Sequence, residues 1–217
     1  MTDSFYLEGL SAPIPLANLD TDQIMPKQFL RGIDKSGLAQ GLFYDMRFDR
    51  QGVPRPDFVL NRPEYAQARM LVANANFGCG SSREHAVWGL LQYGIQAVIA
   101  PSFGEIFYSN AMNNRLLPIM VSEAEVQAIM ADAADPETAH VVIDMQAMTV
   151  RSHSCLASFS MAQRHRDMFM QGLDMIGASL KHQSTIDAFA AGHWAQQPWL
   201  KNVATLTRER LGRQDRA

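Results

Sequence analysis

Short apolar segments that alternate with helical segments constrain the fold of this chain more than any other feature. They are residues 70–75 (MLVANA), 96–101 (QAVIAP) and 116–121 (LLPIMV). Runs of this length, bounded by turn residues, are typical of buried strands. Strands that alternate with helices predict a parallel sheet with helices packed on it and right-handed crossovers between the strands. The sequence therefore predicts an α/β fold.

The flanking regions follow other patterns. Residues 5–29 are rich in Pro and Asp, which predicts short strands and loops in place of a long helix. Residues 140–152 (HVVIDMQAMTVRS) predict a hairpin that turns near 145–147. We expect three parts: a domain over 1–160, a helical extension over 161–200, and a flexible tail over 201–217, where basic residues outnumber acidic ones.

Composition narrows the functional classes. The net charge of −3 argues against a nucleic-acid-binding protein, which would present a basic surface. The two cysteines, Cys79 and Cys155, are too few to hold an iron–sulfur cluster or a zinc ion by thiolates alone. We find no apolar run of membrane-spanning length and no N-terminal signal pattern, so we expect a cytoplasmic protein.

The loop after the first apolar segment, residues 76–86 (NFGCGSSREHA), concentrates the polar chemistry. Gly78 and Gly80 allow positive φ angles and let a ligand approach the main chain. Ser81 and Glu84 have capping-box spacing, which predicts Ser81 as the N-cap of a helix over 82–93. Arg83 adds a fork for a carboxylate, so the loop predicts an anion site with a hydroxyl beside it. The alternative is a well-capped helix with a surface arginine.

Other glycine-rich motifs do not fit this loop. A dinucleotide fingerprint would need a third Gly where Arg83 stands. A Walker loop would need Gly-Lys before the Ser, and a hydrolase elbow would need Gly at alternate positions around it.

Longer stretches of the chain carry a family resemblance. Residues 76–86 resemble the active-site loop of the swivelling domain of the aconitase superfamily. With residues 18–30 (NLDTDQIMPKQFL) and 56–61 (PDFVLN), the chain resembles the family of bacterial 3-isopropylmalate dehydratase small subunits. The similarity continues through residues 98–119 and 172–182. It implies a swivelling β/β/α three-layer domain with a parallel sheet core and a helical C-terminal extension.

The resemblance also implies a reaction. Members of this family belong to a hydro-lyase of leucine biosynthesis, a branched-chain amino-acid pathway, which interconverts 2-isopropylmalate and 3-isopropylmalate by loss and re-addition of water. It implies a heterodimer in which the large subunit holds a [4Fe–4S] cluster and this chain binds no metal. A related substrate, citramalate or dimethylmalate, is the alternative within the family, and a non-enzymatic anion-binding module is the alternative outside it.

Residue roles follow from the matched motifs. Ser81 matches the catalytic base, an alkoxide that removes a proton next to a carboxylate, and Asp22 matches an acid that supports the catalytic groups. A substrate carboxylate would lie against Gly80, Ser82 and Arg83.

Four other positions near these motifs, Asp20, Leu30, Arg31 and His85, have structural or alternative roles. Leu30 suits the isopropyl group, although Arg31 could also point inward. Asp20 is expected to be structural, and His85 fits a packing role as well as a catalytic one.

Overall fold

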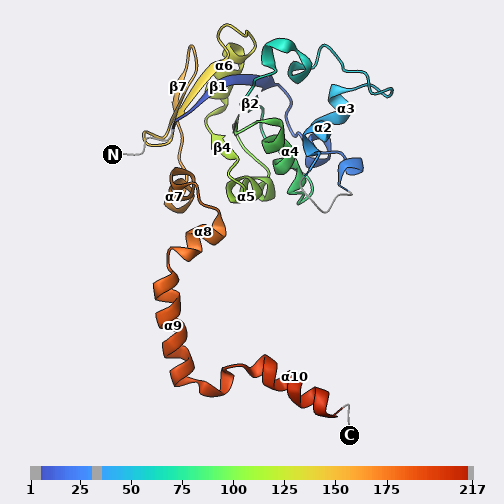
Figure 1. Cartoon of the computed structure of the whole chain (residues 1–217). Coiled ribbons are helices and arrows are strands. Elements are labelled where there is room, and N and C mark those ends of the chain that lie inside the picture. Colours follow the sequence, from blue (N-terminus) through green and yellow to red (C-terminus); the bar gives the residue numbers. More distant parts are fainter. Residues whose placement is uncertain (1–5, 31–35, 215–217) are drawn as a thin grey trace. The chain divides into compact units, whose positions relative to one another are not determined.

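The computed structural model describes residues 6–30 and 36–214. In this part of the chain, seven strands form one mixed sheet in the order β4-β3-β2-β1-β5-β6-β7 (Figure 1). Their bounds are β1 Tyr6–Ile14, β2 Met70–Ala73, β3 Ala97–Ala100, β4 Leu117–Met120, β5 His140–Asp144, β6 Thr149–Arg151 and β7 Leu156–Ser158.

Strand β1 lies at the centre and joins two kinds of pairing. Its residues 11–14 pair in parallel with β2, and its residues 6–10 pair antiparallel with β5. The predicted α/β class and the predicted hairpin, which joins β5 to β6, are confirmed. The parallel arrangement holds for β1 to β4 alone, because β5, β6 and β7 pair antiparallel.

The helices are short, and most of them connect neighbouring strands. Those of the first 174 residues are α1 Thr21–Ile24, α2 Leu38–Gly41, α3 Tyr44–Arg47, α4 His85–Tyr93, α5 Glu105–Asn113, α6 Glu123–Ala133 and α7 Gln163–Gln171. Short 3₁₀ turns occupy Lys27–Phe29, Val59–Asn61, Pro63–Tyr65 and Pro198–Leu200. A capping box opens α6, because Ser122 and Glu125 exchange the two hydrogen bonds of that motif.

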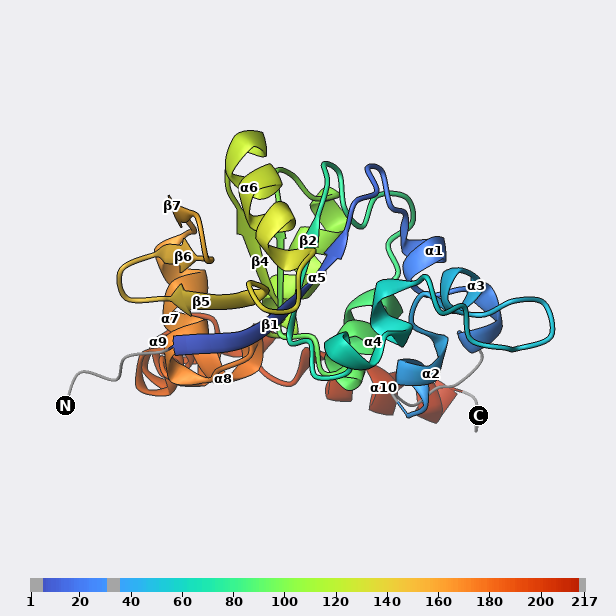
Figure 2. The same ribbon diagram turned by 90° about the horizontal axis from the view of Figure 1, so that it is seen from above.

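The sheet separates two hydrophobic cores, and Figure 2 shows α4 and α6 on its opposite sides. Successive residues of a strand point to opposite faces. Leu71 of β2 therefore lies in the same core as Ala86 and Leu90 of α4, whereas Val72 lies in the core that contains Ile129 of α6. Burial on both faces explains why the parallel strands are almost wholly apolar.

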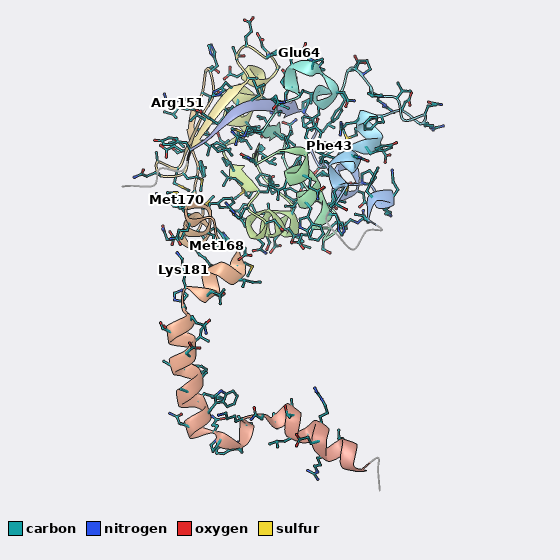
Figure 3. All side chains as sticks on the ribbon, viewed as in Figure 1. Phe43, Glu64, Arg151, Met168, Met170 and Lys181 are labelled. Carbon is teal, nitrogen blue, oxygen red and sulfur yellow. The ribbon has the colours of Figure 1, made fainter. Side chains whose placement is uncertain are left out.

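A segment between β1 and β2 adds small helices beside α4. Phe43, labelled in Figure 3, is fully buried there although its φ is +50°, and its N–H donates to the carbonyl oxygen of Ile24. Leu38 N–H donates to the Gln92 side chain of α4 at 3.0 Å. The first contact joins the start of α3 to α1, and the second joins α2 to α4, the helix that follows the glycine-rich loop. Arg31 lies outside the described residues.

The C-terminal part is a separate compact unit. The chain divides at Asp174, and residues 175–217 form the second unit, which contains α8 Met175–Leu180, α9 Gln183–Gln196 and α10 Val203–Gln214. The expected tail is thus helical over α10. The domain boundaries at residues 160 and 200 stay a prediction. No helix in the described part of the chain is long and apolar enough to cross a membrane.

Candidate active site

The glycine-rich loop after β2 is bound directly to the segment after β1. The Gly78 N–H donates to the Leu19 carbonyl oxygen at 2.7 Å, and the Thr21 N–H donates to the Cys79 carbonyl oxygen at 2.9 Å. Parallel pairing of β1 with β2 brings the carboxyl ends of both strands to the same edge of the sheet. Consequently α1 lies beside the loop that carries Ser81, although some sixty residues separate them in sequence.

Glycine is required at two positions of this loop. Gly78 has a φ of +73°, and a Cβ atom there would lie 2.2 Å from the Phe107 ring. Gly80 has a φ of +92° and packs against α1, where a Cβ atom would meet the Asp20 Cβ at 3.4 Å. Both positive φ angles were expected from the sequence, and they bend the loop so that Ser81 reaches α1.

Ser81 is exposed, and a buried threonine holds it. The Thr21 Oγ1 atom lies 3.0 Å from Ser81 Oγ and 3.1 Å from the Ser81 carbonyl oxygen. Thr21 is 1% exposed, so its hydroxyl is fixed by the surrounding core. The serine hydroxyl therefore has a defined position at the surface, open to a ligand.

Asp22 and Arg83 form an ion pair in which the Arg83 Nη1 donates to Asp22 Oδ1. The Arg83 side chain is 21% exposed and that of Asp22 42%. Lys27 Nζ lies 3.8 Å from the other Asp22 oxygen. One carboxylate thus lies between two cations, and the pairing orients the guanidinium while leaving it donors for a second anion.

The predicted capping box at Ser81 is wrong. Helix α4 begins at His85 with Glu84 as N-cap, and no side chain caps it. The two expected partners are engaged elsewhere: Ser81 contacts Thr21, and the Glu84 carboxylate accepts from Asn114 Nδ2. Tertiary hydrogen bonds have replaced the local ones that the spacing suggested.

Because Ser81 lies before the start of α4, groups other than the helix dipole must supply the positive potential around it. Helix-dipole effects decay within the first turn, and Ser81 precedes that turn. Within the described part of the chain, the N–H groups of Ser81, Ser82 and Arg83 find no acceptor. These N–H groups and the Arg83 guanidinium are the donors available to an anion near Ser81.

The other predicted residues have mixed placements. Gly80 and Ser82 are exposed beside Ser81. Leu30 is half-buried and packs against the core on the α4 side of the sheet. Asp20 has the structural role expected of it, since it caps α1 in a box with Gln23. His85 contacts the Trp88 ring, with 4.8 Å between ring centroids.

Three residues that contact this site were not singled out from the sequence. They are Thr21, Lys27 and Asn114. Thr21 stands between Asp20 and Asp22 in a run of polar residues. Such a run does not show that one of its members is buried. Asn114 follows α5, so only the tertiary structure shows that it binds both Glu84 and the Trp88 indole N–H, the latter at 2.9 Å.

The described residues contain no group of three or more His, Cys, Asp or Glu side chains that could hold a metal ion. A cubane iron–sulfur cluster needs several thiolates, and Cys79 donates to the Asn18 carbonyl oxygen while Cys155 packs against the other core. The donor set of this chain therefore does not fit such a cluster.

Comparisons with known proteins agree with this geometry. Residues 1–124 match the family described as the aconitase C-terminal domain. The 3-isopropylmalate dehydratase small subunit 1 of Chromobacterium violaceum is 67% identical over 211 residues, which cover 97% of this chain and 100% of that protein. A 3-isopropylmalate dehydratase small subunit of Phenylobacterium zucineum is 50% identical over 199 residues, covering 91% and 97% of the two chains.

A solved structure extends the comparison to the fold. The crystal structure of 3-isopropylmalate dehydratase from Methanocaldococcus jannaschii matches with a TM-score of 0.62 and 26% sequence identity, covering 86% of this chain and 99% of that one. High identity over nearly the whole length, the shared domain and the shared fold lead to one conclusion: this chain belongs to the family of 3-isopropylmalate dehydratase small subunits, within the aconitase group of hydro-lyases.

Proposed function

We propose that this chain supplies the base and the carboxylate clamp of a two-subunit 3-isopropylmalate dehydratase. The observation that carries the proposal is the placement of Ser81 and Arg83 by two adjacent residues, Thr21 and Asp22, from another segment. An exposed hydroxyl, an oriented guanidinium and loop N–H groups that have no acceptor among the described residues together fit a hydroxy-dicarboxylate better than a simple anion.

Ser81 Oγ, as the alkoxide, takes the proton from the substrate carbon next to a carboxylate. The new O–H bond forms as the C–H bond breaks. The electron pair of the C–H bond becomes the second bond of the C=C group in the isopropylmaleate intermediate, as hydroxide leaves the neighbouring carbon. Return of water in the other orientation gives the isomer. An alkoxide near neutral pH needs concentrated positive potential, which Arg83 and the loop N–H groups provide.

Arg83, Ser82 and the main chain at Gly80 bind one substrate carboxylate. The guanidinium is suited to this because its flat fork matches two carboxylate oxygens at once. Asp22 holds the guanidinium in place. The position of the substrate relative to Ser81 is thereby fixed before proton transfer. Holding the reacting groups in this way supplies much of the rate advantage of such a site.

The large subunit is proposed to hold the [4Fe–4S] cluster, since the donors of this chain do not fit one. When bound there, the cluster supplies the Lewis acid that accepts the leaving hydroxide. The complete site would then lie between two chains, each inactive alone. We place this enzyme in the cytoplasm, in leucine biosynthesis.

Leu30 is proposed to contact the isopropyl group. An apolar side chain suits an alkyl substituent, because an unpaired polar group beside it would be costly. Citramalate and dimethylmalate are the alternative substrates. The variant Leu30→Ala should distinguish them from isopropylmalate. We expect kcat/KM for 3-isopropylmalate to fall more than that for citramalate, which has the smaller alkyl group.

Anaerobic reconstitution tests the proposal. The purified chain is mixed with its cluster-bearing large subunit, and conversion of 2-isopropylmalate, citramalate and dimethylmalate is followed in separate assays. Activity in the mixture and none in either chain alone supports the proposal. An active lone chain, or a stable complex that does not turn over any of the three substrates, contradicts it.

A further inference from the structure

We propose that Thr21 is a positioning residue whose single hydroxyl proton changes acceptor during the reaction, from the carbonyl oxygen of Ser81 to its Oγ. This inference rests on the proposed role of Ser81 as base. It assigns Thr21 a part in the reaction beyond packing.

The geometry offers one donor two acceptors. Thr21 Oγ1 is 3.1 Å from the Ser81 carbonyl oxygen and 3.0 Å from Ser81 Oγ. A threonine hydroxyl has one proton and can accept as well as donate. When Ser81 is neutral, its O–H donates to Thr21 Oγ1 and the Thr21 O–H donates to the Ser81 carbonyl oxygen, so that every proton has an acceptor.

The alkoxide form of Ser81 requires the other arrangement. Ser81 then has no proton to donate, and its negative oxygen is a far better acceptor than a carbonyl oxygen. Rotation of the Thr21 O–H by one torsion directs its proton to Ser81 Oγ, where a charge-assisted hydrogen bond forms. No heavy atom has to move, so the stabilisation is ready before the substrate arrives.

Among the described residues, the Thr21 hydroxyl has these two acceptors, and its surroundings hold it beside them. The residue as a whole is 1% exposed, so water does not compete freely for the hydroxyl. Its N–H is bound to the Cys79 carbonyl oxygen, and Gly80 lies close enough that an added Cβ atom would be 3.7 Å from Thr21 Oγ1. Thr21 is therefore held against the loop by both its main chain and its side chain.

Three variants of the reconstituted enzyme test the inference. Thr21→Val removes the hydroxyl and keeps the shape, whereas Thr21→Ser keeps the hydroxyl. We expect T21V to lower kcat about 10- to 100-fold, the worth of one hydrogen bond to a charged group, with KM nearly unchanged. The rise of kcat with pH should move to higher pH in T21V, and T21S should restore both. Thr138→Val is the matched control. The Thr138 hydroxyl also donates to a carbonyl oxygen, that of Asp132 at 2.7 Å, but this residue does not belong to the site.

The outcomes separate this inference from the function on which it rests. Near-normal turnover by Ser81→Ala would overturn the proposed base itself. An inactive S81A together with a T21V enzyme of normal kcat and pH profile would overturn the inference alone, as would equal losses in T21V and T21S. Should T21V not assemble with the large subunit, Thr21→Cys replaces it: a weak S–H donor of similar size should show the same shift of the pH profile, and an unshifted profile counts against the inference.

Discussion

The Arg83 guanidinium and the Asp22 carboxylate form an ion pair that joins the loop after β2 to the first helix after β1. Two strands pair side by side, and the residues that follow them meet at their carboxyl ends. Thr21 and Asp22 each bind one residue of the loop, so the orientation of Ser81 and that of Arg83 depend on the same turn of α1.

Replacing Arg83 by Lys should weaken substrate binding at the clamp. Lysine keeps the charge but loses the fork, which removes at least one charge-assisted hydrogen bond. We expect kcat/KM of the reconstituted enzyme to fall about 10- to 100-fold. Steady-state kinetics measure this, and Arg164→Lys on α7 is the matched control. A value for R83K within twofold of the wild type would show that Arg83 does not bind the substrate.

Gly78→Ala should destabilise the domain, because the new Cβ would overlap the Phe107 ring as well as occupy a positive φ. Overpacking and backbone strain each cost about 1–3 kcal/mol. Gly94→Ala is the control, since Gly94 also has a positive φ but no atom within 4 Å of the added Cβ. Urea unfolding should give a larger loss for G78A than for G94A, and equal losses would contradict the packing argument.

Asn114→Ala should loosen the start of α4. Asn114 accepts from the Trp88 indole and donates to Glu84, so its loss leaves two half-buried polar groups without these partners. We expect a loss of about 1–3 kcal/mol in the free energy of unfolding. Asn113→Ala, one residue earlier on α5, is the control. Equal unfolding midpoints for N114A and the wild type would be inconsistent with this role.

Asp132 gives the domain a pH-dependent contact between α6 and the β6–β7 turn. Burial alone would raise its pKa, but hydrogen bonds from Ser152 and Ser154 outweigh burial and hold the pKa below its ordinary value. A carboxyl group whose pKa is lowered in the folded state stabilises the folded protein at pH values above its unfolded-state pKa of about 3.9. This stabilisation disappears as the pH falls through the folded-state pKa.

The stability difference between the wild type and Asp132→Asn should therefore be largest at neutral pH. It should shrink as the pH is lowered from about 5 towards 2. Urea unfolding at a series of pH values measures it, with Asp135→Asn as the comparison at a neighbouring acid. A difference that stays constant over this range would exclude the proposed contribution of Asp132.

The sequence predicted the parallel half of the fold because burial on both faces leaves a plain signal in the apolar strands. Strand β1 was less evident, since Pro13 is unusual in a central strand. The structure explains the exception: residues 11–14 pair with β2, whereas β5 pairs only with residues 6–10. At Pro13 the missing N–H therefore faces no β5 partner.

The residues of the site could be predicted from the sequence, but their hydrogen-bond partners could not. Ser81 and Glu84 stand at capping-box spacing, yet both bind partners far away in sequence, namely Thr21 and Asn114. Local spacing cannot reveal such competition, because it depends on which segments the fold brings together. For the same reason, the sequence does not show that Thr21, between Asp20 and Asp22, is buried against the loop.

The role of Ser81 as base is tested most directly by kcat of Ser81→Ala in the reconstituted enzyme with 2-isopropylmalate. Ser109→Ala, at an exposed serine on α5, is measured beside it. Co-purification with the large subunit and circular dichroism establish that both variants assemble and fold. A positioned base contributes about 10²- to 10⁴-fold, so S81A should lose at least about 100-fold in kcat while S109A keeps wild-type turnover. An assembled S81A enzyme that retains near-normal kcat would show that Ser81 does not remove the substrate proton.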